Sequence, residues 1–298
     1  MNLAAGLVAS RFVHYLALSV LFGGALFPFY GMKEQLRAPA WLALLLRAAA
    51  LLALISGISW LMFTAAGMSG SIAGLTDPHV LWLVVSSTDF GRVWVLRLVL
   101  AAGLVVLAWA GHMGREKHYA LLAGSLILLA SIALTGHAGS DSSRFGFLHR
   151  AADAIHLIAA GVWIGALVML SALVITAARS RSWDELAGLH YGLTQFSGTG
   201  TAVVVALLVT GLINPGFLAS LTTLYGRVLL AKLGVFGCML VLAAANRFWL
   251  TPLLGGTMQA RADSRAAVRM LGASVVSETM LAMLVLLAVA WLGTLAPP

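Results

Sequence analysis

Residues 152–178 read ADAIHLIAAGVWIGALVMLSALVITAA, and this run decides the class of the fold. Asp153 and His156 lie near its start, and no ionisable side chain follows them within the run. A helix needs about 20 mostly apolar residues to cross the hydrocarbon core of a bilayer, and this run is longer than that. We therefore predict a membrane-spanning helix here.

The rest of the chain has the same character. Of its 298 residues, 61% are hydrophobic and only 9% are charged, whereas a soluble domain has roughly 25% charged residues. This composition excludes a soluble fold and predicts an all-α, polytopic membrane helix bundle, with residues 1–298 forming a single transmembrane domain. About eight runs are long and apolar enough to span, at residues 9–30, 42–64, 92–111, 119–136, 152–178, 196–214, 226–246 and 270–294.

The distribution of basic residues predicts the orientation. The connections after the odd-numbered spans hold ten lysines and arginines, and the opposite side holds five. Because cytoplasmic loops carry the excess of basic residues, both termini should be periplasmic. The same rule accounts for the net charge of +8, so we expect no nucleic-acid partner. Residues 65–91 form the longest outer loop, and the apolar segment from Pro78 to Val85 within it is too short to span and should lie at the membrane interface.

Other classes of site are excluded by the cysteine content. Cys238 is the only cysteine, so an intramolecular disulfide and a cysteine-based zinc or iron–sulfur centre are ruled out. A metal would have to use histidine, methionine or carboxylate ligands. The N-terminal apolar stretch lacks a basic start and a small-residue cleavage site, so we expect it to remain as the first span.

Histidines gather in the predicted outer half of the protein, together with most of the aspartates. His149, Asp153 and His156 are spaced i, i+4 and i+7, which puts them on one stripe if the fifth helix already includes them. A neutral imidazole nitrogen binds metal, and a nearby carboxylate can orient the ring. The alternative is an interfacial histidine with an aspartate at a helix start. The other outer histidines are His14, His79 and His137.

Two of these histidines differ in how strongly they suggest a function. His14 lies about two turns inside the first predicted span, where a polar side chain needs a partner within the bundle. His137 ends the fourth span between small residues, and by itself it is equally typical of a helix end and of a ligand.

Glu278 lies near the middle of the last predicted span, where an ionised carboxylate is costly unless it is paired. It is either a carrier of a proton or cation, or a structural partner of Lys232, Asn246 or a serine. The chain also has eleven methionines, whose thioethers suit Cu(I), although most methionines in apolar bundles fill gaps in the packing.

Several spaced motifs together resemble the copper resistance protein D family of bacterial inner-membrane proteins, known as CopD or PcoD. The resemblance covers nearly the whole chain. It rests on Thr88-Asp89-Phe90-Gly91-Arg92-Val93-Trp94 with Arg97, Gly136-His137-Ala138, residues 153–165 (DAIHLIAAGVWIG), Tyr225-Gly226-Arg227, Leu229-Leu230-Ala231-Lys232, Asn246-Arg247 and the helix of Glu278.

The resemblance implies a multi-pass inner-membrane protein of copper homeostasis that moves copper across the membrane, alongside a periplasmic copper-binding protein of the CopC type. It also implies that His137 and His156 bind the metal, with His14 matching a histidine in the family's first span and with His149 and Asp153 in the same matching region. The cargo would be Cu(I) or Cu(II), because Mg²⁺ and Ca²⁺ favour clustered oxygen ligands. No nucleotide-binding motif is present, so transport would have to follow a gradient or an ion coupling. We do not expect an enzyme.

Two other functions stay open from the sequence. Paired histidines from different helices could ligate b-type haem, which would make the chain a membrane redox protein. Alternatively, the chain could receive copper as a scaffold without moving it across the membrane. Metal analysis with a visible absorption spectrum distinguishes a haem protein from a copper-binding protein. Copper uptake into proteoliposomes distinguishes a transporter from a scaffold.

Overall fold

The computed structural model describes residues 2–32, 39–135, 146–180, 182–213 and 223–295. Within these ranges the chain is helical without a β-strand, and eight helices are long and apolar enough to cross a membrane. The predicted all-α bundle of about eight spans is confirmed. The helices that form the spans are α1 (Leu3–Leu26) with α2 (Pro28–Gly31), α3 (Ala40–Ser69), α5 (Asp89–Trp109), α6 (Arg115–Ala130) with the short η2 (Ser131–Leu134), α7 (Gly146–Ser180), α8 (Trp183–Ile213), α9 (Leu224–Ala245) with its continuation, and α11 (Arg265–Leu292).

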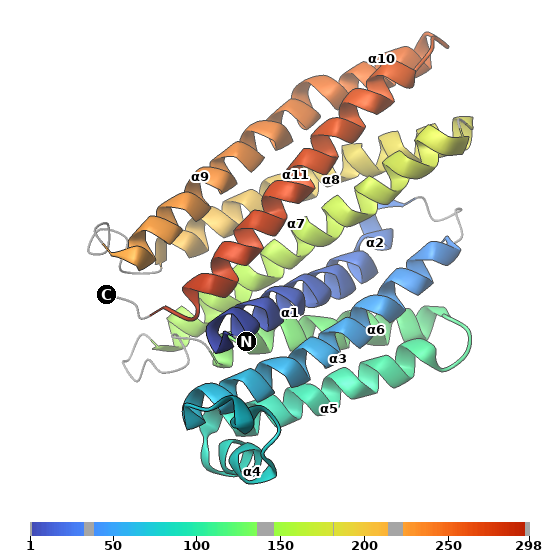
Figure 1. Ribbon diagram of the computed structural model, residues 1–298. Helices are drawn as coiled ribbons and strands as arrows, with labels where there is room; N and C mark the ends of the chain where they lie inside the picture. Colours follow the sequence, from blue (N-terminus) through green and yellow to red (C-terminus); the bar gives the residue numbers. More distant parts are fainter. Residues whose placement is uncertain (1, 33–38, 136–145, 181, 214–222, 296–298) are drawn as a thin grey trace.

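Helices α1 and α7 lie side by side at the centre of the bundle (Figure 1). Their backbones touch at glycines: a Cβ atom on Gly23 would lie 2.3 Å from the carbonyl oxygen of Gly161, and one on Gly165 would lie 2.4 Å from Cα of Gly23. Small residues allow this approach, and the resulting close packing stabilises helix pairs in a bilayer. Gly161 and Gly165, one turn apart on α7, thus form a tight contact with α1.

The two sides of this central pair carry different helices. Helices α3, α5 and α6 pack on the side of α1, and α8, α9 and α11 pack on the side of α7, while α1 also touches α11. The predicted spans are all present, but several helices extend beyond the predicted edges. The largest differences are at α8, which begins at Trp183, and at the seventh span, which runs from Leu224 to Gln259. These extensions are more polar than the spans, and hydropathy alone does not reveal helix outside the apolar core.

The seventh span contains a π-helical segment, η4 (Asn246–Leu250), between α9 and α10 (Thr251–Gln259). Proline explains its position. Pro252 has no N–H to donate to Phe248 one turn earlier, and its ring clashes with the carbonyl group there. The backbone N–H of Thr251 instead donates to the carbonyl oxygen of Asn246, five residues back. Such π-bulges often occur at functional sites.

Both ends of the described chain lie at the same end of the bundle (Figure 1), as an even number of spans requires. The Arg11 side chain of α1 lies against Gly293, just after α11. The connection 65–91 contains the short helices η1 (Ile72–Leu75) and α4 (Pro78–Ser87), and α4 packs against α3 and α5. Trp82 of α4 is 67% exposed. The periplasmic location of this end and the interfacial position of α4 stay predictions.

Candidate functional site

His14 is buried between α1, α3 and α5, with 3% of its surface exposed. Its Nε2 atom lies 2.9 Å from a terminal nitrogen of Arg97. Its Nδ1 atom lies 3.0 Å from the carbonyl oxygen of Ala53 and 3.1 Å from the hydroxyl of Ser56. A guanidinium only donates hydrogen bonds, so Nε2 must accept from Arg97 and Nδ1 must carry the ring proton. Both nitrogens of this neutral imidazole are therefore occupied, and its one available lone pair, on Nε2, is not free for copper or haem iron in this arrangement.

Arg97 lies on α5 and is 4% exposed. Its side chain connects three helices. It donates to the carbonyl oxygen of Leu128 at 2.8 Å and to the hydroxyl of Ser131, where α6 ends and leaves carbonyl groups without helical partners. Its guanidinium also lies 4.8 Å from the ring centre of Trp94, within the range of a cation–π interaction. These contacts compensate in part for an arginine inside the membrane. The Trp60 and Trp94 rings flank His14, with ring centres 5.6 and 5.7 Å from its own.

His156 faces the other side of the bundle. Its Nδ1 atom lies 2.8 Å from the hydroxyl of Thr210 on α8. That hydroxyl also lies 2.6 Å from the carbonyl oxygen of Ala206, to which it can donate its one proton. With the proton directed there, Thr210 accepts from Nδ1–H of His156. The Nε2 atom is left with a lone pair, and the described part of the chain supplies it with no hydrogen-bond partner. This is the tautomer that a metal-binding histidine needs.

The other predicted ligands of the outer half differ in position and in their partners. Helix α7 begins at Gly146 and includes His149, Asp153 and His156, so the condition for their common stripe is met. Thr210, rather than the aspartate, holds Nδ1 of His156. Lys232 of α9 interacts electrostatically with both His156 and Asp153. His137 lies outside the described residues.

The structure does not give His14 and His156 a common hydrogen-bonding partner, because they face opposite sides of the central helix pair. His79 is exposed at the start of α4, where its backbone N–H is capped by Asp77. Among the described residues, no group of three or more histidine, cysteine, aspartate or glutamate side chains is placed to hold a metal ion. A site with His14, His137 and His156 as joint ligands stays a prediction.

Glu278 lies deeper, on α11, and is 1% exposed. Its two carboxylate oxygens accept hydrogen bonds from the indole N–H of Trp163 at 2.8 Å and from the amide nitrogen of Asn246 at 3.0 Å. Of the structural partners named from the sequence, Asn246 is confirmed, and Trp163 is an addition. All three residues line a cavity of about 190 Å³ between α7, α8, α9 and α11.

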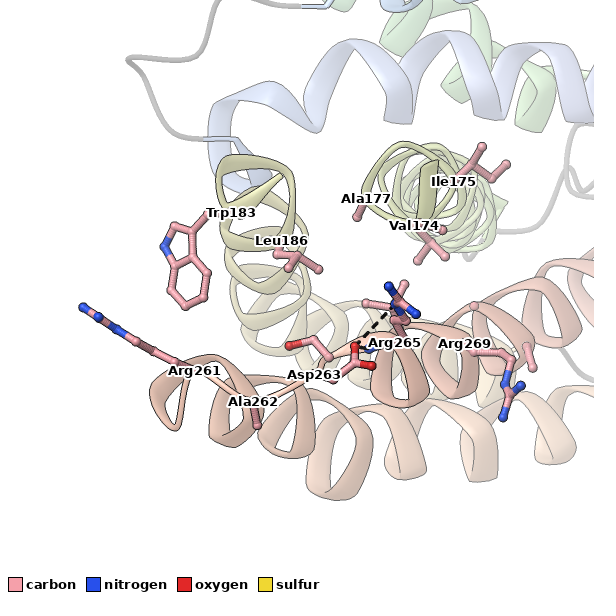
Figure 2. A pocket seen from close by; sticks show the side chains of 15 residues that line it. Val174, Ile175, Ala177, Trp183, Leu186, Arg261, Ala262, Asp263, Arg265 and Arg269 are labelled. Atoms are coloured by element: carbon pink, nitrogen blue, oxygen red, sulfur yellow. Dashed lines mark hydrogen bonds and ion pairs between the residues drawn. The ribbon is translucent and has the colours of Figure 1, made fainter. Parts of the chain in front are cut away.

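A larger groove, of about 1080 Å³, lies at the end of the bundle where α10 meets α11. Its lining includes Trp183, Arg261, Arg265 and Arg269, and Arg265 forms an ion pair with Asp263 (Figure 2). None of the predicted metal ligands that the structure describes lines it. Size alone therefore does not identify the functional site of this protein.

Comparisons with known proteins agree with the architecture. Residues 1–147 match the family model "Copper resistance protein D-like, N-terminal domain", and residues 190–292 match "Copper resistance protein D". Copper resistance protein D of Pseudomonas syringae pv. tomato is 34% identical, over 97% of this chain and 96% of its own length. The chain belongs to the copper resistance protein D family. Like other members of this family, it is a multi-pass protein of the inner membrane.

Two further relatives extend the comparison. Inner membrane protein YebZ of Escherichia coli (strain K12) is 30% identical over 82% of this chain and 84% of its own length. Copper transport protein CutJ of Bacillus subtilis (strain 168) is 29% identical over 83% of this chain, which covers 47% of that relative. No solved structure matches the chain.

Three residues of these polar clusters were not identified as functional from the sequence: Arg97, Thr210 and Trp163. Arg97 could have been found, because a charged side chain inside a span needs internal partners. A threonine or tryptophan inside a span has many structural uses, so the other two gave no such signal.

Proposed function

We propose that this protein transports copper across the inner membrane and that His156 is the central ligand of a copper site in its outer half. A copper-handling role in the membrane follows from membership of the copper resistance protein D family. The observation that supports the site is the hydrogen bond from His156 to Thr210, which leaves Nε2 as a preorganised ligand.

The stripe of His149, Asp153 and His156 supports entry from the outer surface. These residues occupy the first three turns of α7, so a metal arriving at the start of the helix would meet His149 first. Asp153 would offset the charge of an incoming cation, whereas Lys232 would oppose it. His137, in the connection that precedes α7, is the predicted additional ligand. A separate periplasmic protein of the CopC type would deliver the copper.

His14 has a different position in this proposal. It can bind copper only when Arg97 withdraws from Nε2, because one lone pair cannot accept a hydrogen bond and ligate a metal at once. His14 would then be a ligand that becomes available when a conformational change moves Arg97 away. In the arrangement described here, His156 is the ligand that is ready to bind.

The test is metal analysis of the purified protein together with its visible absorption spectrum. The wild-type protein and a His112→Ala control, altered at an exposed histidine, should retain copper, and His156→Ala should lose it. Equal copper content in all three would refute the site. A Soret band of near-stoichiometric intensity would instead show a haem protein. Copper uptake into proteoliposomes that contain only this chain distinguishes a transporter from a scaffold, since a scaffold would bind copper without moving it.

A further inference from the structure

Glu278 combines deep burial with an incomplete set of partners. It is the thirteenth residue after the start of α11 at Arg265, about 20 Å along the helix. Both of its partners, Trp163 and Asn246, are neutral donors. An ionised carboxylate in the membrane usually has a cationic partner, and the described residues provide Glu278 with no ion pair within salt-bridge distance.

We propose that Glu278 is a proton-exchange site within the membrane and that the amide of Asn246 is its partner in both protonation states. The side-chain oxygen of Asn246 is buried and has no hydrogen-bond partner in the described structure. In the ionised state, the amide nitrogen donates to Oε2 of Glu278, as observed. After protonation, a half-turn of the amide would place the unpartnered oxygen where it accepts from the new O–H group. Asparagine supplies both a donor and an acceptor at the end of one side chain.

The chemical step is simple. The O–H bond of the carboxylic acid breaks, the electron pair stays on Oε2, and the proton passes to water in the cavity. No electron is transferred and no other bond changes. The cavity of about 190 Å³ is large enough for several water molecules. Ser197, Thr201 and Arg247 contribute polar atoms to its wall, and Arg247 lies just after the predicted inner edge of the seventh span. A proton would therefore exchange with the inner side.

The described charged groups around Glu278 do not form an ion pair that would prevent this proton exchange. Arg247 is the other charged residue that lines the described cavity. Its guanidinium donates to the carbonyl oxygen of Ser197 at 3.0 Å and to the hydroxyl of Thr201. Elsewhere on the packed helices, Lys232 interacts electrostatically with His156 and Asp153, Cys238 is exposed, and His14 and Arg11 lie against α3 and beside Gly293. No described cation is thus hydrogen-bonded to the carboxylate to fix it in the ionised form.

The π-helical segment η4 supports this assignment through the position of Asn246. This residue opens the segment, and the widened turn presents its amide to α11. A proton site near the middle of the last span, below a copper site in the outer half, would couple inward copper movement to proton movement. This coupling rests on the proposed function, whereas the proton site does not.

The test of the site itself needs no copper. Infrared difference spectra between acidic and alkaline buffer would be recorded on the full chain in lipid nanodiscs. We expect a carboxylic C=O band that Glu278→Gln removes and that Glu116→Gln, altered at an exposed glutamate of α6, retains. An accompanying amide band should disappear in Asn246→Leu. Glu278→Gln resembles the neutral acid in shape, so it should fold, and its elution as a single species checks this. Absence of the carboxylic band from the wild type, or its survival in Glu278→Gln, would overturn the proposal.

A second measurement tests the coupling. In proteoliposomes with an internal pH indicator, copper addition should change the internal pH in the wild type, and Glu278→Gln should reduce that signal at least tenfold while copper content is unchanged. If the infrared band is present but the wild type moves no copper, the proton site stands and the proposed transport fails. If copper moves at the wild-type rate and with the same pH change in Glu278→Gln, the coupling is refuted.

Discussion

Replacing Gly165 by alanine should separate the two central helices. The new Cβ atom would lie 2.4 Å from Cα of Gly23, 2.6 Å from its carbonyl carbon and 2.9 Å from the backbone nitrogen of Gly24. All three atoms belong to the backbone, so no side-chain rotation can relieve the contact. Carbon atoms pack at about 3.5–4.0 Å, and α1 would have to move away from α7 by about 1 Å. Overpacking of this kind costs about 1–3 kcal/mol.

The assay is thermal unfolding of detergent-solubilised protein, followed by loss of the monodisperse peak in size-exclusion chromatography. The matched control is Gly103→Ala on α5, where a Cβ atom would meet nothing within 4 Å and where alanine favours the helix by up to about 1 kcal/mol. We expect a midpoint for Gly165→Ala that is several degrees below the wild type, and a control at or above the wild type. A Gly165→Ala protein as stable as the control would show that the close contact of α1 with α7 does not hold the bundle together.

Three other substitutions test the polar clusters. Thr210→Val keeps the shape of the side chain but removes the acceptor for His156, and it should weaken copper binding about 10–100-fold; unchanged affinity in a copper titration would contradict the role of the hydrogen bond. Lys232→Met removes a like charge from the site and should tighten copper binding by about tenfold, or about 1.4 kcal/mol, in the same titration; weaker binding would show that the lysine supports the site. Arg97→Lys keeps the charge but loses the planar arrangement of donors and should lower thermal stability by about 1–3 kcal/mol, whereas Arg92→Lys, at an exposed ion pair, should not.

Sequence reasoning predicted the fold well because the physics of the bilayer is strict. Every span had to be a long apolar helix, since no other open backbone structure satisfies its hydrogen bonds in hydrocarbon. This constraint does not apply outside the membrane. The starts of α7 and α8, and the continuation of the seventh span to Gln259, were therefore predicted poorly. The break at Asn246 could have been expected from Pro252, because proline disrupts the hydrogen bond one turn earlier.

The polar residues were harder to predict than the helices. Hydropathy identifies the depth of a residue but not the direction in which its side chain points around the helix. His14 and His156 were placed correctly within their spans, yet they face α3 with α5 and α8 with α9 respectively. Glu278 was recognised from its cost in the membrane, and Asn246 was named among its possible partners. Trp163 comes from α7, 115 residues away in sequence, and no spacing rule connects such positions.

The contacts of α1 with α7 also limit the route that the proposed copper transport can take. Gly23 touches Gly161 and Gly165, and these two odd-numbered spans run in the same direction, so His14 lies level with residues 152–156 of α7. His14 and His156 are therefore at similar depth on opposite sides of the central pair. A copper ion that passed from one to the other would move sideways within the outer half, not through the membrane. Two histidines at one depth cannot be successive steps of a transmembrane path, so crossing must depend on deeper groups. In the C-terminal half of the described bundle, a polar cluster that meets this requirement is Glu278 with Trp163 and Asn246, beside a cavity whose inner wall is polar.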